Sequence, residues 1–368
     1  MTSTLDLDKA LLMPIVQKVL VSTTFEISSF EISPLKPGVG NVTSLGVYRV
    51  VIEILHRGQV ESISVVVKHL ADGRPLIDTR DPAHWNHWRR EIEFFQSPLV
   101  HLIPESIHFP RYLGHTLLAN GSELFWNEDL GDLEKLEWSW EQCLRAAELE
   151  AELNSIRDPS IDQYPWLNRS QLEGWLELRV NFFDPLFPKV AEIARDDSAL
   201  LSAFENFENY LSQPQLIIDV LRTSRQCFVH GDFNLNNLVT VSGRGGQITA
   251  LDWQLCGIAA IGSEIAAIFN TARERGVIKP TRLLFDEICT FYMNRYNALN
   301  PEAAISFKEV CLAAAAMGYF ILEGDGFFFH QPDPAKSGEE NGASLREMLV
   351  DFAEGPLSLY ATILHELL

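Results

Sequence analysis

The first third of the chain is patterned for β-strands. Runs rich in Val and Ile are separated by turn residues, which is typical of β-strands. Apolar residues at helical spacing predict a short helix that begins near Pro14 and a second helix over residues 88–95. The predicted strands lie at 32–53, where two strands flank a glycine-containing turn, and at 63–70, 111–114 and 123–132.

The rest of the chain is patterned mainly for helices. The spacing of apolar residues predicts one long helix over 133–156, short helices and loops broken by proline over 157–225, and further helices over 282–368. We expect the last of these segments to break at Gly324-Asp325-Gly326 and across a proline- and glycine-containing loop at 330–343.

The two patterns divide the chain into two parts. Residues 1–130 form the β-rich part and residues 131–368 the larger helical part, so we predict an α+β protein with two lobes, as expected for a chain longer than one core supports. The longest apolar run, 311–322, is too short to cross a bilayer and predicts a buried helix.

Two short apolar runs inside the helical part each lead into a polar loop. Asp232 follows the run that ends at Val229, Asp252 follows the run that begins at Ile248, and Asn237 lies between them. Two carboxylates and an amide supply oxygen ligands for a hard cation such as Mg2+, and one carboxylate remains to orient a hydroxyl nucleophile. Phosphoryl transfer needs both. Any one of these residues alone would more often be a turn former.

The glycine-containing turn is a candidate phosphate-binding loop. Gly40 could let backbone N–H groups approach phosphates closely, because glycine has no side chain and an unrestricted φ. The family resemblance described below implies that a polar residue at the tip, Asn41, Thr43 or Ser44, covers the phosphates. The turn does not have the full G-x-G-x-x-G spacing, so a plain hairpin turn is the alternative.

Lys68 is the candidate ligand of the nucleotide phosphates. It lies near the end of an apolar, β-branched strand, where a single cation is unusual. The alternative is an edge lysine that prevents aggregation. Glu91 lies beside the apolar stripe of the helix predicted at 88–95 and could reach Lys68.

These residues resemble a known family. His230-Gly231-Asp232, with Asn237 five residues after the aspartate and Leu251-Asp252-Trp253 further on, resembles the aminoglycoside phosphotransferase and choline kinase superfamily. The resemblance implies a bilobal protein-kinase-like fold. An N-terminal lobe with an antiparallel sheet and a C-helix would bind the nucleotide, and a mainly helical C-terminal lobe would be catalytic.

The resemblance also implies roles for the site residues. Asp232 would direct the acceptor hydroxyl at the γ-phosphorus of ATP, Asn237 and Asp252 would hold Mg2+, and His230 would support the loop by hydrogen bonding. Adenine would bind at residues 126–129, with Trp126, Glu128 and Asp129 as the candidate contacts. Glu264 stands where the family commonly has aspartate, and would either hold the loop or face the substrate.

Two further residues are candidates for contact with the acceptor. Trp138 stands among glutamates that could cradle a cation, although a solvated face with partly buried aromatic residues explains it equally well. Asp184 lies in the segment where members of the superfamily vary to fit their substrates.

Composition narrows the partners. The net charge of −21 opposes nucleic acid and anionic membranes and would attract a cationic substrate, although acidity also serves solubility alone. The five cysteines are scattered without a C-x-x-C pair, which favours buried thiols over disulfides or a thiolate metal site. The first residues lack the basic and apolar regions of a signal peptide, so we expect a cytoplasmic protein.

The function that follows is an ATP- and Mg2+-dependent kinase of a small-molecule hydroxyl, such as that of an aminoglycoside or of an amino alcohol like choline. The alternatives are a non-catalytic nucleotide-binding or scaffold protein on the same fold and, with less support, a protein kinase. The last is disfavoured by Gly231, which replaces the arginine found in protein kinases. The sequence leaves open the acceptor, the choice between ATP and GTP, and the oligomeric state.

Overall fold

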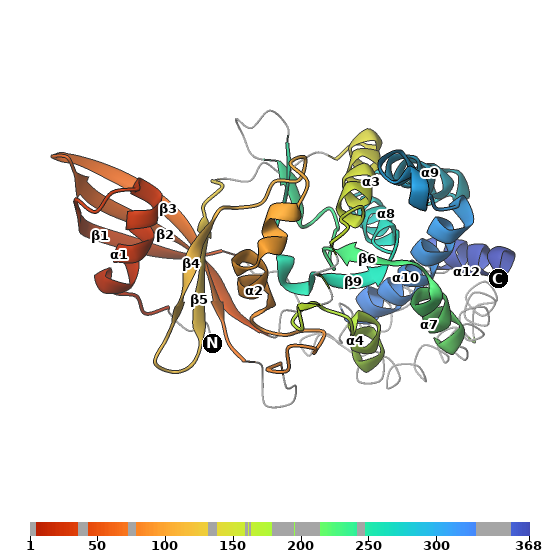
Figure 1. Ribbon diagram of the computed structural model, residues 1–368, viewed down its shortest axis with the longest axis horizontal. Coiled ribbons are helices and arrows are strands. Elements are labelled where there is room, and N and C mark those ends of the chain that lie inside the picture. The colour runs from red at the N-terminus through yellow and green to blue at the C-terminus, as the bar shows by residue number, and fades with distance from the viewer. Residues whose placement is uncertain are drawn as a thin grey trace. The chain divides into compact units, whose positions relative to one another are not determined.

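A computed structural model describes residues 5–35, 43–72, 79–131, 138–158, 161, 163–178, 195, 214–240, 247–328 and 355–368. The chain forms two compact units (Figure 1). The first unit consists of Met1–Lys135 with two later insertions, Ile161–Leu167 and Val239–Leu255. The second consists of Leu136–Ser160, Asn168–Leu238 and Cys256–Leu368.

The first unit is built on a five-stranded antiparallel sheet in the order β1-β2-β3-β5-β4 (Figure 1). Side chains of β2 and β3 point alternately to a buried and to a more exposed face, so that Val50, Ile52, Val65 and Val67 are fully buried on one face. The strands are β1 (Phe25–Leu35), β2 (Ser44–His56), β3 (Gln59–Leu70), β4 (Tyr112–Leu117) and β5 (Glu123–Glu128).

The helix α1 (Lys9–Leu20) closes the core of this sheet with Leu12, Ile15 and Val16. It begins one turn before the predicted start at Pro14. The reason is that the Asp8 side chain caps the helix by accepting the N–H of Leu11 at 2.8 Å. The apolar periodicity of the helix then continues through the proline.

The second unit is mainly helical (Figure 1). A capping box between Ser139 and Gln142 starts α3 (Trp140–Asn154), which packs along α9 (Arg282–Leu299). The strands β6 (Gln226–Val229) and β9 (Gly257–Ala260) pair as a small antiparallel ribbon, and β6 leads into the loop of residues 230–237 that contains Asp232. The other helices described are α4 (Gln171–Leu178), α7 (Pro214–Thr223), α8 (Ile265–Glu274), α10 (Phe307–Phe328) and α12 (Pro356–Leu367).

The apolar run of residues 311–322 forms a buried helix, as predicted, because its residues up to Tyr319 are almost all inaccessible to solvent within α10. The predicted break at Gly324-Asp325-Gly326 is wrong, since α10 continues to Phe328. A glycine costs a helix only about 1 kcal/mol relative to alanine, and burial of the preceding turns outweighs that cost.

All five cysteines are free and buried, so the prediction of buried thiols is confirmed. In the described part of the chain, no helix combines the length and the hydrophobicity needed to cross a membrane. The loop predicted at 330–343 lies outside the described residues.

Candidate active site

A buried lysine forms the centre of the first unit's polar site. The ammonium nitrogen of Lys68, on β3, lies 2.8 Å from Oε2 of Glu91 and 2.8 Å from Oδ1 of Asp252. Glu91 comes from the first turn of α2 (Arg90–Gln96), and Asp252 follows β8 (Ile248–Ala250). The sequence-based expectation that Glu91 could reach Lys68 matches this geometry.

The charges of the triad depend on one another. Burial opposes the Lys68 ammonium, but the carboxylates of Asp252 and Glu91 outweigh it and raise the pKa of Lys68 above its ordinary value. Burial raises the pKa of the Glu91 carboxyl, and the Lys68 ammonium opposes that rise. The Asp252 side chain is the most exposed of the three at 38%, against 11% for Lys68 and 6% for Glu91. It is therefore the member that solvent or a ligand can contact.

The loop around Asp252 is fixed to α2 from two sides. The N–H of Trp253 donates to Oε1 of Glu91 at 3.2 Å, and the fully buried Trp253 ring stacks on Phe94 with 4.7 Å between centroids. Asp252 itself has a left-handed backbone with φ of 59°, a conformation that Asp tolerates better than most residues because its side chain can bond locally.

Arg90 is a residue that the sequence analysis missed. Its side chain is fully buried, and its guanidinium donates to the backbone carbonyls of Gln254 at 3.0 Å and Trp166 at 2.6 Å. It also donates to the carbonyls of His84 and Trp85. One planar group thus fixes the loop after Asp252 to α2 and to two other loops. A buried arginine normally has a carboxylate partner, and the sequence around Arg90 does not reveal that its partners are backbone carbonyls instead.

In the second unit, β6 leads directly into the loop that carries Asp232. Gly231 has φ of 89°, a left-handed conformation that favours glycine, and it turns the chain so that Asp232 follows the strand. His230 accepts the N–H of Asp232 at Nδ1, at 3.3 Å, in agreement with its expected support of the loop. Asp232 therefore sits on a rigid turn and not on a free loop.

The Asp232 carboxylate accepts two amide hydrogen bonds. Nδ2 of Asn237 lies 2.6 Å from its Oδ2, and Nδ2 of Asn234 lies 2.5 Å from its Oδ1. Because Asn237 uses its nitrogen here and on the Asp232 carbonyl at 3.0 Å, its oxygen is the amide atom that remains for a cation.

Glu264 holds this loop by hydrogen bonds to its backbone. Its carboxylate accepts the N–H of Phe233 at 2.9 Å and that of His230 at 3.1 Å. Burial raises the pKa of Glu264 to about 7, with the two N–H groups opposing and Asp232 adding to the rise. Glu150 of α3 is also buried, and burial together with repulsion from Glu264 raises its pKa well above the ordinary value.

Known proteins share this fold. The GDP and kanamycin complex of APH(2″)-IIIa aligns with a TM-score of 0.51 and 14% identity over 93% of this chain and 97% of that one. The GDP complex of wild-type aminoglycoside 2′-phosphotransferase-IIIa aligns with 0.50 and 12% over 94% and 99%. A Plasmodium vivax ethanolamine kinase gives 0.48 and 11% over 100% and 92%. Among curated proteins, none matches the chain.

A sequence model of the phosphotransferase enzyme family matches residues 61–298, which include both aspartate loops and Lys68. The chain belongs to this phosphotransferase family. The expected α+β fold of the small-molecule kinases is confirmed, and with it the assignment of the chain as an enzyme of that type.

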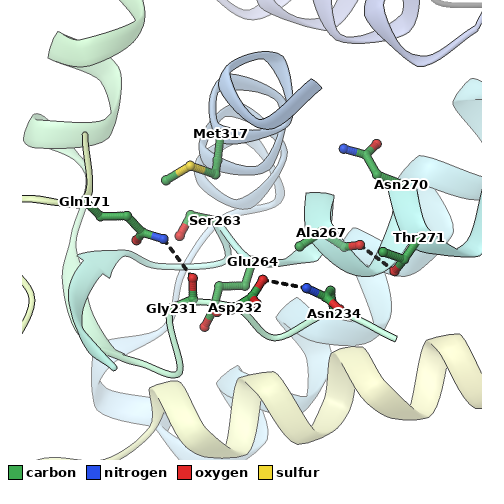
Figure 2. Close-up of a pocket in the computed structure, with 10 residues that line it drawn as sticks. All are labelled: Gln171, Gly231, Asp232, Asn234, Ser263, Glu264, Ala267, Asn270, Thr271 and Met317. Carbon is green, nitrogen blue, oxygen red and sulfur yellow. Dashed lines mark hydrogen bonds between the residues drawn. The ribbon is translucent and has the colours of Figure 1, made fainter. Parts of the chain in front are cut away.

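A cavity of about 70 Å³ adjoins Asp232 in this phosphotransferase (Figure 2). The loop from Gly231 to Asn234, the residues that open α8, and Met317 of α10 form its walls. Gln171 of α4 lies at its edge and donates to the carbonyl of Gly231 at 2.9 Å. Glu264 lines it too, so the structure places Glu264 both under the loop and beside the cavity.

The oxygen chemistry of the two loops fits Mg2+. Asp252 and Asn237 offer a carboxylate and an amide oxygen, and Mg2+ typically takes one or two protein oxygens and completes its shell with water and phosphates. Among the described residues there is no group of three or more His, Cys, Asp or Glu that could hold a metal alone.

Two of the other residues predicted to contact the nucleotide, Thr43 and Trp126, are buried. Thr43 is fully buried and accepts a hydrogen bond from Gln254, so its side chain is not at a loop tip; Ser44 begins β2. Trp126 is a fully buried core residue. Gly40 and Asn41 lie outside the described residues.

The carboxylates at the end of β5 have partners. Asp129 accepts from Arg49 and from Ser64, and Glu128 accepts the N–H of Arg111 at 3.1 Å. Their side chains hold the strand end together.

The candidate acceptor contacts are not brought to the cavity in the described residues. Trp138 is 92% buried just before α3 and does not line the cavity, and Asp184 lies outside the described residues. Sequence reasoning missed Asn270, Ser263 and Glu150, because nothing distinguishes a buried polar residue of a helix until its neighbours are known.

Proposed function

We propose that this phosphotransferase moves the γ-phosphate of a nucleoside triphosphate, in the presence of Mg2+, to a hydroxyl of a small molecule. The observation that carries the proposal is the Asp232 carboxylate, which the amides of Asn234 and Asn237 hold at 2.5 and 2.6 Å on a turn beside a cavity. A carboxylate held in this way can accept a hydrogen bond from an alcohol and orient it for attack.

Each residue of the site then has a distinct task. Asp232 orients the acceptor hydroxyl and takes its proton. Lys68, whose raised pKa keeps it charged, neutralises phosphate oxygens, and Glu91 holds Lys68 in position. Mg2+ would be bound by oxygens of Asn237 and Asp252 and would neutralise phosphate charge when bound. Catalysis is then mostly positioning and charge neutralisation.

The nucleotide contacts remain proposals. We place the phosphates against the turn of Gly40, Asn41 and Ser44, and adenine against the backbone of residues 126–129, within a nucleotide-binding lobe of residues 1–130. Residues 131–368 form the catalytic lobe. The two related structures with the highest TM-scores quoted above are GDP complexes, so the donor base is tested with both ATP and GTP. The acidity of the chain supports an acceptor with cationic groups.

The test is acceptor-dependent consumption of ATP or GTP across aminoglycosides, amino alcohols, sugars and nucleosides. Asp232→Asn serves as the blank because it keeps the size of the side chain and one of its two acceptor oxygens but cannot take a proton. We expect at least one acceptor to raise turnover 100-fold or more above the blank.

A chain with no turnover above the blank, but with stabilisation by Mg-ATP in a thermal melt, would be a non-catalytic nucleotide-binding protein instead. Phosphate transfer to protein and to no small molecule would favour a protein kinase.

A further inference from the structure

Two buried polar groups that line the cavity beside Asp232 have no partner among the described residues. Nδ2 of Asn270 and Oγ of Ser263 make no hydrogen bond within the described part of the chain, although Asn270 is only 2% exposed and Ser263 only 1%. Both residues line the cavity with Asp232 (Figure 2). Buried polar groups are almost always paired, so a water or a ligand atom in this space would complete these two.

The orientation of the Asn270 amide is fixed by a neighbour. The hydroxyl of Tyr360, a fully buried residue of α12, donates to Oδ1 of Asn270 at 2.7 Å. The amide nitrogen is therefore the atom without a partner, and Figure 2 shows it on the side of the amide that faces Met317. Asn270 presents a hydrogen-bond donor to the cavity.

A donor at this position selects the chemistry of the ligand. An ammonium group carries donors only and cannot accept a hydrogen bond from Asn270, whereas a hydroxyl, ether or carbonyl oxygen can. The charged residues lining the cavity in the described chain are Asp232, which is reserved for the reacting hydroxyl, and Glu264, which already accepts two backbone N–H groups. Neither is placed to neutralise a second cation.

We propose that the phosphate acceptor places a neutral oxygen in this cavity, next to the hydroxyl presented to Asp232, and that Asn270 and Ser263 recognise it. The inference rests on the proposed function and specifies its substrate class, namely a polyol or the diol edge of a sugar. The cavity of about 70 Å³ is roughly half the size of the engineered lysozyme cavity that admits benzene, so it holds only a few heavy atoms. Amino groups of the acceptor would lie elsewhere on the molecule.

The proposal is tested with acceptor pairs that differ only at the neighbouring group. Glycerol is compared with 2-aminopropane-1,3-diol, and glucose with glucosamine, at neutral pH. We expect kcat/KM to be at least tenfold higher for the oxygen member of each pair. Ser263→Ala should lower kcat/KM for the oxygen member severalfold.

Asn270→Asp provides the sharper variant, because it keeps the bond from Tyr360 and replaces the donor with an acceptor. We expect it to lower the preference for the oxygen member at least tenfold. Asn297→Asp is the matched control. It removes a bond to the carbonyl of Ile305 in the same unit and should leave the preference unchanged. A preference of the native enzyme for the amine members, or the same preference in Asn270→Asp, would overturn the proposal in favour of a buried water.

A binding measurement separates failure of this inference from failure of the proposed function. If no compound is phosphorylated, thermal melts with glycerol, glucose and their amino counterparts still report on the cavity. Stabilisation by the oxygen members that is lost in Asn270→Asp would support the recognition of oxygen without catalysis. Absence of any such stabilisation in a protein that also shows no turnover would overturn the inference itself.

Discussion

The ammonium nitrogen of Lys68 lies 2.8 Å from a carboxylate oxygen of Asp252, although 184 residues separate them in the sequence. With Glu91 it forms a compact charge group inside the first unit. The opposite charges of the three side chains offset the cost of burying each one. Removing one charge therefore lowers the stability of the fold and, separately, the activity, and these two effects can be measured in different experiments.

Lys68→Met should both destabilise and inactivate the enzyme. The substitution leaves the buried Glu91 carboxylate without its cation, which costs about 3 kcal/mol or more of unfolding free energy. The double variant Lys68→Met/Glu91→Gln should recover most of that stability and none of the activity. Urea denaturation and kcat/KM, measured side by side, check this; Lys279→Met, at an exposed position, is the control. Recovery of activity in the double variant would contradict the role of Lys68.

Asp252→Asn should keep the backbone conformation at position 252 and remove only the charge of the side chain. Asparagine tolerates the left-handed φ of 59° as well as aspartate does, so the fold should melt within a few degrees of the native protein. The lost charge should raise the Mg2+ concentration for half-maximal turnover at least tenfold. Asp286→Asn is the control, since Asp286 pairs with Arg282 on the surface of α9. An unchanged Mg2+ requirement would remove Asp252 from the metal site.

Arg90→Lys should destabilise the first unit despite keeping the charge. Lysine cannot reproduce the planar fork that meets the carbonyls of His84, Trp85, Trp166 and Gln254, so at least two bonds to a charged donor are lost. We expect a loss of about 3 kcal/mol in urea denaturation. Arg89→Lys, one residue earlier and part-exposed, should cost less than about 1 kcal/mol. Equal losses in the two variants would show that the fork is not the cause.

The stability of the second unit should fall as the pH rises from about 5 to 7. The pKa of Glu264 is about 7 in the folded protein against an ordinary value of 4.5, so between these values the folded chain keeps a proton that the unfolded chain has released. The stabilisation is therefore complete below pH 4.5 and is lost as the pH rises through 7, by up to about 3 kcal/mol.

Glu150→Gln should flatten this pH profile, because it removes a second buried carboxyl whose own raised pKa makes the folded chain keep a proton that the unfolded chain releases. Glu148→Gln, on the same helix but paired with Arg145 at the surface, should leave the profile unchanged. Urea midpoints at pH 5, 6, 7 and 8 check both variants. Parallel slopes in the native protein and Glu150→Gln would refute a contribution of Glu150 to the pH dependence.

The sequence was sufficient for the strands of the first unit, because β-branched runs such as those in β2 and β3 are a local signal. It was also sufficient to identify Lys68, Glu91, Asp232 and Asp252, since each stands at a strand end or on a helix with a recognisable neighbour. Their roles in phosphoryl transfer stay predictions until the variants are measured.

What the sequence could not supply depends on three-dimensional neighbours. Nothing near Arg90 in the chain indicates that its partners are carbonyls as distant as Gln254. The helix predicted to begin near Pro14 begins earlier because a single side chain, Asp8, satisfies its first turn. Thr43 was expected at the tip of the phosphate loop by resemblance, whereas it is fully buried and accepts a hydrogen bond from the distant Gln254.

The buried cysteines have a practical consequence. All five, at positions 143, 227, 256, 289 and 311, belong to the second unit, and all are buried. A thiol reagent can therefore modify the native chain only when that unit opens, while the first unit contributes no signal. The rate of thiol labelling thus measures local opening of the unit that contains Asp232. A change in this rate on adding an acceptor would report binding of the acceptor without an engineered probe.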